Sequence, residues 1–170
     1  MKKLLFIALL SLSTTIFAQT YDVSTLRIGE FKIFMSKQSA EQIGTKTLEL
    51  NVDYEKGNKV NYYGENIDIL LSEQYQGENK PNKIGVYLLR TKSRKFRTKS
   101  GLGVGSSRPE LIEAYKSYPN FEVYQYKDPE NPTKVESFFT LKDHDAGTFL
   151  SFKMMNDMVI EITVGVEEGC

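Results

Sequence analysis

The sequence predicts an α+β fold in which two short helices lie on one face of an antiparallel sheet. Most segments alternate apolar and polar residues with a period of two, which is the pattern of half-buried strands. Short turns separate many of these segments, so consecutive strands are expected to pair antiparallel. Only two stretches have helical spacing, and both are short. A chain with a few short helices and many consecutive antiparallel strands is expected to pack its helices on one face of the sheet.

Four strands are predicted in the first half of the chain. In the first of them, Leu48, Leu50 and Val52 alternate with polar neighbours. The four strands span residues 47–54, 60–62, 67–72 and 84–88. Turns at 55–58 and 64–66 and a polar loop at 76–82 separate them.

Four further strands are predicted in the second half. They span residues 121–126, 135–141, 150–154 and 158–164. Asn156 and Asp157 separate the last two, which indicates a tight two-residue hairpin. In the strand at 121–126, Tyr124 and Tyr126 share one face, opposite Phe121 and Val123.

Each helix begins at a serine. Ser107 and Glu110 form a capping box with Pro109 in the first turn, and Leu111, Ala114, Tyr115 and Tyr118 then share one face. The earlier helix is predicted to begin after Ser36, to carry Ala40 and Ile43 on one face, and to end at Gly44.

The order of elements repeats along the chain. Met35-Ser36 and Gly105-Ser106 are 70 residues apart, and each pair precedes a short helix followed by several strands. We therefore expect a signal peptide at 1–18 and two tandem α+β halves, 19–94 and 95–170, that share one compact unit. Independent convergence of the halves on one plan is the alternative, because few of their residues are identical.

The first 18 residues resemble a bacterial signal peptide. Lys2 and Lys3 precede an apolar stretch, and Ile16-Phe17-Ala18 forms a small-residue cleavage site. A transmembrane anchor is disfavoured because serines and threonines interrupt the stretch. Export to the periplasm or the medium is therefore expected. Cleavage removes two of the 22 basic residues and leaves a net charge of −2.

The chain has one His and one Cys, which excludes an internal disulfide and a zinc site built from several such residues. Cys170 can pair only with another molecule. Asp143-His144-Asp145 is interpreted as a polar loop and not as a metal site. A hydrolase that uses Ser106 or Ser107 with His144 has no support from spacing. We predict no catalytic residue, no metal and no cofactor.

Residues 90–99 form a basic segment with six Lys or Arg residues in ten positions. It separates a region of net charge −2 (19–89) from one of −6 (100–170). A solvated linker is one interpretation, because like charges prevent edge-to-edge aggregation. The other is a site for an anionic partner, completed by amides at the following helix start. Its candidate residues are Lys92, Arg94, Lys95, Arg97, Lys99, Ser106, Ser107 and Arg108.

Two related ligand classes are not expected. Nucleic acid needs a broader basic face than this acidic chain offers. The glycines of 101–105 lack the Gly-Lys-Ser/Thr ending of a phosphate-binding loop.

The ten tyrosines and ten phenylalanines suggest an interaction surface, since tyrosine is frequent at protein interfaces. Helices on one face leave the other sheet face uncovered, so some aromatic residues are expected there. Tyr124 and Tyr126 are the candidates, and packing within the sheet is the alternative.

Residues 101–111 (GLGVGSSRPEL), followed by Ala114 and Tyr115, resemble the helix opening of exported bacterial domains of the beta-lactamase inhibitor protein and barrel-assembly lipoprotein type. The ending at 149–153 and 159–164 is similar to their final hairpin. The resemblance implies a helix-plus-sheet module, often in tandem, that binds proteins without catalysis. The paired cysteines of the inhibitor family are missing here, and no contact residue transfers.

Together these observations predict an exported, non-enzymatic domain that binds a protein partner, of inhibitor or immunity type. Two alternatives stay open: an envelope assembly or structural factor, and a binder of a small anionic ligand that uses the basic segment. The sequence leaves the partner and the oligomeric state undetermined.

Overall fold

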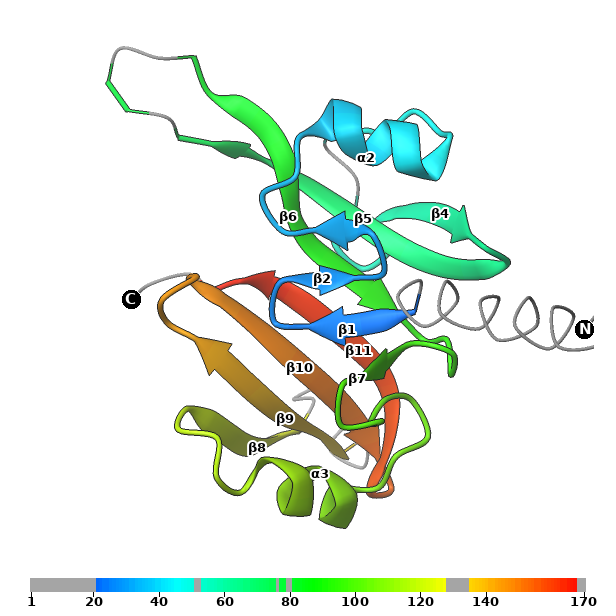
Figure 1. Cartoon of the computed structure of the whole chain (residues 1–170), viewed down its shortest axis with the longest axis vertical. Coiled ribbons are helices and arrows are strands. Elements are labelled where there is room, and N and C mark those ends of the chain that lie inside the picture. Colours follow the sequence, from blue (N-terminus) through cyan, green and yellow to red (C-terminus); the bar gives the residue numbers. More distant parts are fainter. Residues whose placement is uncertain (1–20, 51–52, 76, 79–80, 128–134, 168–170) are drawn as a thin grey trace, which may run out of the picture.

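The computed structural model describes residues 21–50, 53–75, 77–78, 81–127 and 135–167. They form an α+β fold with a seven-stranded antiparallel sheet, a small four-stranded sheet and two helices (Figure 1). The predicted fold class is confirmed. In spatial order, the large sheet consists of β4 (Asn58–Tyr62), β5 (Glu65–Gln74), β6 (Lys83–Thr91), β11 (Met158–Val166), β10 (Thr148–Met155), β9 (Val135–Asp143) and β8 (Phe121–Lys127).

The small sheet was not predicted. In spatial order it consists of β3 (Phe31–Lys32), β2 (Arg27–Ile28), β1 (Asp22–Ser24) and β7 (Arg97–Thr98). Strands of two or three residues are too short to produce a period-two pattern. β1 and β7 pair parallel although they are far apart in sequence, and only the tertiary fold brings them together.

The two helices are α2 (Lys37–Gly44) and α3 (Arg108–Tyr115). The capping box of Ser107 and Glu110 is confirmed, and Ser36 caps α2. The predicted end at Gly44 is confirmed, and the left-handed residue that caps the helix is Thr45, which follows it. Gly44 serves a different purpose: a Cβ there would lie 2.8 Å from Cγ1 of Val60, so glycine lets the helix approach β4 closely.

Both helices and the small sheet pack on one face of the large sheet, which we call the inner face. Ala40 of α2, Leu111 of α3 and Phe31 of β3 belong to one buried cluster that also contains side chains of the large sheet. Tyr115 of α3 packs against Phe152, with ring centroids 6.4 Å apart. The core is therefore continuous between the halves.

The strand predicted at 47–54 is absent from its described residues, 47–50 and 53–54. A side chain replaces the missing strand partner: Asn58 accepts a hydrogen bond from the backbone N–H of Glu49 and donates one to its carbonyl, each 2.8 Å long. The alternation in this segment reflects burial of Leu48 without a backbone ladder. Asn51 and Val52 lie outside the described residues.

The hairpin predicted at Asn156 and Asp157 is confirmed. Met155 pairs with Met158, and φ is 51° at Asn156 and 61° at Asp157. Two successive positive φ values match a type I′ turn, whose twist fits the strands on either side.

Both halves attach the start of their helix to their last strand by the same two hydrogen bonds. The N–H of Phe34 donates to the carbonyl of Val86, whose own N–H donates to Met35. In the second half, Gly105 and Ser106 bond Val159 in the same way. Their tandem origin remains a prediction.

The predicted signal peptide and Cys170 lie outside the described residues. In the part of the chain that the structure describes, no helix has the length and hydropathy needed to cross a membrane.

Candidate functional site: the outer face of the large sheet

The face opposite the helices, which we call the outer face, carries both apolar and polar side chains. Strand β10 illustrates the difference, since Leu150, Phe152 and Met154 point into the core. The alternate residues Phe149 and Ser151 face the other way. The outer face is therefore partly apolar and reached by solvent.

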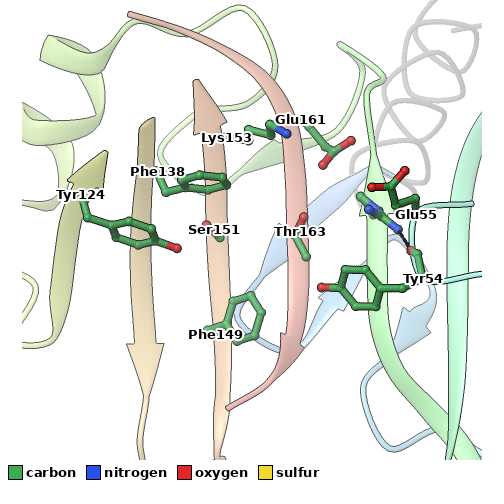
Figure 2. A pocket seen from close by; sticks show the side chains of 10 residues that line it. Tyr54, Glu55, Tyr124, Phe138, Phe149, Ser151, Lys153, Glu161 and Thr163 are labelled. Carbon is green, nitrogen blue, oxygen red and sulfur yellow. Dashed lines mark hydrogen bonds between the residues drawn. The ribbon is translucent and has the colours of Figure 1, made fainter. Parts of the chain in front are cut away.

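This face is hollowed between β8 and the loop that precedes β4. The hollow has a volume of about 350 Å³ and is open to solvent (Figure 2). Two adjoining hollows share Phe149 with it. We call the central part the outer groove and define it by Tyr54, Tyr124, Phe138, Phe149, Ser151 and Thr163.

Phe149 can lie over the neighbouring strand β11 because its cross-strand neighbour there is a glycine. Phe149 pairs with Gly165, and a Cβ at Gly165 would lie 2.8 Å from Cζ of the Phe149 ring. The glycine lets the ring lie low over the sheet, which makes it part of the groove floor.

Tyr54 forms one wall of the groove. Arg90 holds it: its Nη2 donates a hydrogen bond of 2.5 Å to the carbonyl of Tyr54, and its guanidinium lies 5.4 Å from the centre of the Tyr54 ring. A Cβ at Gly57 would lie 2.9 Å from Cδ1 of Leu70. The loop is thus fixed against the outer face by close packing.

Tyr124 forms the opposite wall. Its ring stacks on Phe138 with centroids 5.1 Å apart and an interplanar angle of 16°. Burial, followed by the nearby Glu122 carboxylate, raises the pKa of the Tyr124 hydroxyl above its ordinary value. The hydroxyl therefore stays protonated at neutral pH and can donate a hydrogen bond. Tyr126 shares this face but does not line the hollow.

Ion pairs within the protein occupy one end of the groove. Lys153 contacts Glu136 at 2.8 Å, and Lys92 contacts Glu161 at 3.5 Å. Because Lys153 and Glu161 are cross-strand neighbours, charges of opposite sign alternate across three strands.

The other end is neutralised in the same way. Lys142 contacts Glu122 at 2.7 Å and Glu167 at 3.3 Å. Hydrogen bonds to these carboxylates raise the pKa of Lys142 above its ordinary value. The groove thus offers an apolar middle between ends that carry paired charges.

The basic segment does not form one surface in the structure. Lys92 reaches the groove end, whereas Lys95 contacts Glu65 at 2.7 Å. Arg97 donates to the carbonyl of Val104 at 2.9 Å. Arg108 contacts Asp157 at 2.9 Å. Arg94 and Lys99 are exposed.

The amides that an anion would use at the start of α3 already donate within the protein. Gly103 N–H donates to the hydroxyl of Ser106 at 3.1 Å, and Ser107 N–H to the carboxylate of Glu110 at 2.7 Å. Arg108 N–H donates to the carbonyl of Asp157 at 2.9 Å. The structure therefore gives no support for an anion site here.

Asp143 is the last residue of β9, and His144 and Asp145 belong to the turn that connects β9 to β10. Asp143 accepts a hydrogen bond from Ala146 N–H, and His144 Nδ1 lies 2.9 Å from Glu167. Within the described ranges, no three His, Cys, Asp or Glu residues are placed to hold a metal ion.

Of the residues proposed from the sequence, the structure brings Tyr124 and Lys92 to the outer groove. Sequence reasoning missed Tyr54, Phe138 and Phe149. A usable signal was present at Phe149, which is an aromatic residue on the polar face of an alternating strand. Comparison with protein-family models, curated proteins and solved structures finds no significant match to this chain.

Proposed function

We propose that the protein is an exported binding domain that receives a segment of another protein in the outer groove. One observation carries the proposal: a solvent-open hollow on the uncovered sheet face is walled by Tyr54 and Tyr124 and floored by Phe149 (Figure 2). Large aromatic side chains that remain exposed after folding are typical of the contact residues of interfaces.

The groove fits an apolar or aromatic side chain flanked by polar backbone. Its middle offers rings for contact, while Ser151 and Thr163 supply hydroxyls on the floor. Its end charges are paired internally, so binding a charged ligand would require those pairs to break. Apolar burial, with hydrogen bonds at the rim, is the main attraction that this surface can provide.

Two sequence observations support the same class of function. The expected leader supports an exported mature protein, and the resemblance is to exported domains that act by binding other proteins. An inhibitor or immunity role and a role in envelope assembly both use such a surface, and the identity of the partner decides between them.

The test is retention of a partner by the immobilised protein from envelope and culture-supernatant extracts of the producing bacterium. The variant Tyr54→Ala/Tyr124→Ala removes both walls. The control is Tyr75→Ala, because Tyr75 is 70% exposed and lies outside the groove. We expect one protein, identified by mass spectrometry, that saturates the wild type and the control and is retained at least tenfold less by the double variant.

Failure of the wild type to retain any saturable protein would contradict the proposal. Equal retention by the double variant would contradict the assignment of the groove.

A further inference from the structure

The two edge strands of the large sheet differ in how their backbones are covered. Beside β4, Lys46 Nζ donates a hydrogen bond of 2.9 Å to the carbonyl of Lys59, and the Asn58 side chain bonds the backbone of Glu49. The segment that precedes β4 therefore protects this edge. In β8, at the opposite edge, all seven residues are exposed.

The backbone of β8 has hydrogen-bonding groups that β9 does not use. Lys142 N–H donates to the carbonyl of Asn120 at 2.8 Å, which makes these residues a hydrogen-bonded pair. The register is regular from Phe121 to Lys127. Since hydrogen-bonded pairs alternate in an antiparallel ladder, the even-numbered residues bond to β9. The N–H and C=O groups of the odd-numbered residues point away from it.

Strand β8 lacks the features that usually block an open edge. It contains no proline or glycine, and its pairing with β9 shows no bulge. Its charges, Glu122 and Lys127, lie near its ends. Phe121, Val123 and Tyr124 are 38%, 41% and 49% exposed. A seven-residue aromatic edge with regular register is suited to pairing with another strand.

We propose that β8 pairs antiparallel with β8 of a second copy, with Tyr124 on the two-fold axis. In this register Phe121 faces the partner's Lys127, Glu122 faces the partner's Tyr126 and Val123 faces the partner's Gln125. No like charges oppose one another. The outward N–H and C=O groups of the odd-numbered residues face those of the partner's odd-numbered residues, so they can form hydrogen bonds.

Geometry selects this register. A shift of one residue would place outer-face side chains opposite inner-face ones, which the pleat forbids. A shift of two residues shortens the seven-residue pairing. The same patch serves both copies, as a two-fold interface requires. The large sheets then join into one, and the two outer grooves open on the same side.

Sedimentation equilibrium of the purified protein tests the pairing. The wild type is expected to reach twice the mass of one chain as its concentration rises. Gln125→Pro removes one outward N–H and is expected to weaken dimerisation at least tenfold, while its circular dichroism spectrum stays that of the folded wild type. Gln125→Thr keeps the N–H and is the matched control, expected to dimerise as the wild type does. A wild type that stays monomeric at all concentrations would overturn the proposal.

Cross-linking tests the register without relying on proline. In a Cys170→Ser background, Tyr124→Cys places two thiols at a non-hydrogen-bonded pair, where Cα atoms are about 4.5 Å apart. Mild oxidation should yield a covalent dimer. The control Tyr126→Cys in the same background faces the partner's Glu122 and should stay uncross-linked. Cross-linking at position 126 and not at 124 would refute the register.

Discussion

The two faces of the large sheet differ in how far they bury similar residues. Phe152 and Phe149 lie three positions apart on β10, yet Phe152 is fully buried beneath α3, whereas Phe149 lies in the open groove. The inner face is closed by α2, α3 and the small sheet. The outer face keeps aromatic side chains within reach of solvent.

This contrast separates what holds the fold together from what is available for contact. A buried ring stabilises the fold by leaving water and by filling its space closely. Removing a ring from an open groove should lower the free energy of unfolding much less. The stability of the fold therefore does not by itself explain why such a ring is present.

Replacing the two phenylalanines should have unequal effects on the free energy of unfolding. Phe152→Ala leaves a cavity in the core and is expected to cost about 3–5 kcal/mol. Phe149→Ala removes a ring that solvent already reaches, and we expect a cost of about 1 kcal/mol. Urea unfolding followed by circular dichroism measures both. Equal costs would show that the outer ring is as structural as the inner one.

Loss of the α3 cap should weaken the inner face moderately. Ser107→Ala removes the side-chain acceptor of the capping box and is expected to lower the free energy of unfolding by about 1 kcal/mol. Ser117→Ala, at an exposed serine beyond the end of α3, is the control and should change little. An equal loss of unfolding free energy in Ser117→Ala and Ser107→Ala would show that the cap does not stabilise the helix.

The same cap should produce a small dependence of stability on pH. Hydrogen bonds from the Ser107 backbone and hydroxyl lower the pKa of Glu110 below its ordinary value of 4.5. A carboxyl with a lowered pKa stabilises the fold above its unfolded pKa, and this contribution is lost as pH falls through the folded pKa.

Glu110→Gln should therefore be less stable than the wild type at pH 7, and the difference should shrink at pH 3. Chemical unfolding at the two pH values measures it. A difference that grows toward low pH would have the wrong sign.

Much of the fold could be predicted because its signals are local. The alternation in β10 and β11, the Asn156-Asp157 turn and the capping box at Ser107 each depend on residues close in sequence, and all three are present. Local alternation gave a wrong prediction for residues 47–54, where the described residues form no strand. The apolar pattern there is real, but the Asn58 side chain satisfies backbone groups that a strand would otherwise have paired.

Most of the groove could not be predicted from the sequence, because its residues come together only through contacts between distant segments. Tyr54 reaches the outer face only because a loop crosses there and Arg90 holds it. Phe149 forms the floor because Gly165 is its neighbour on another strand. Such relations depend on register between strands, which residue spacing alone does not give. Tyr124 could be anticipated because alternation within the predicted strand puts it on one face with Tyr126, opposite Phe121 and Val123.

The outer groove is proposed to bind a protein while contributing little to stability. Thr163→Arg tests this claim most directly, because Thr163 lies on the groove floor and the longer side chain would fill the hollow. Thr47→Arg makes the same change at an exposed residue away from the groove.

The measurement is retention of the partner from envelope and supernatant extracts, with urea unfolding of the same preparations. We predict that Thr163→Arg loses the partner, that Thr47→Arg retains it, and that both unfold within about 1 kcal/mol of the wild type. Full retention of the partner by folded Thr163→Arg would contradict the claim.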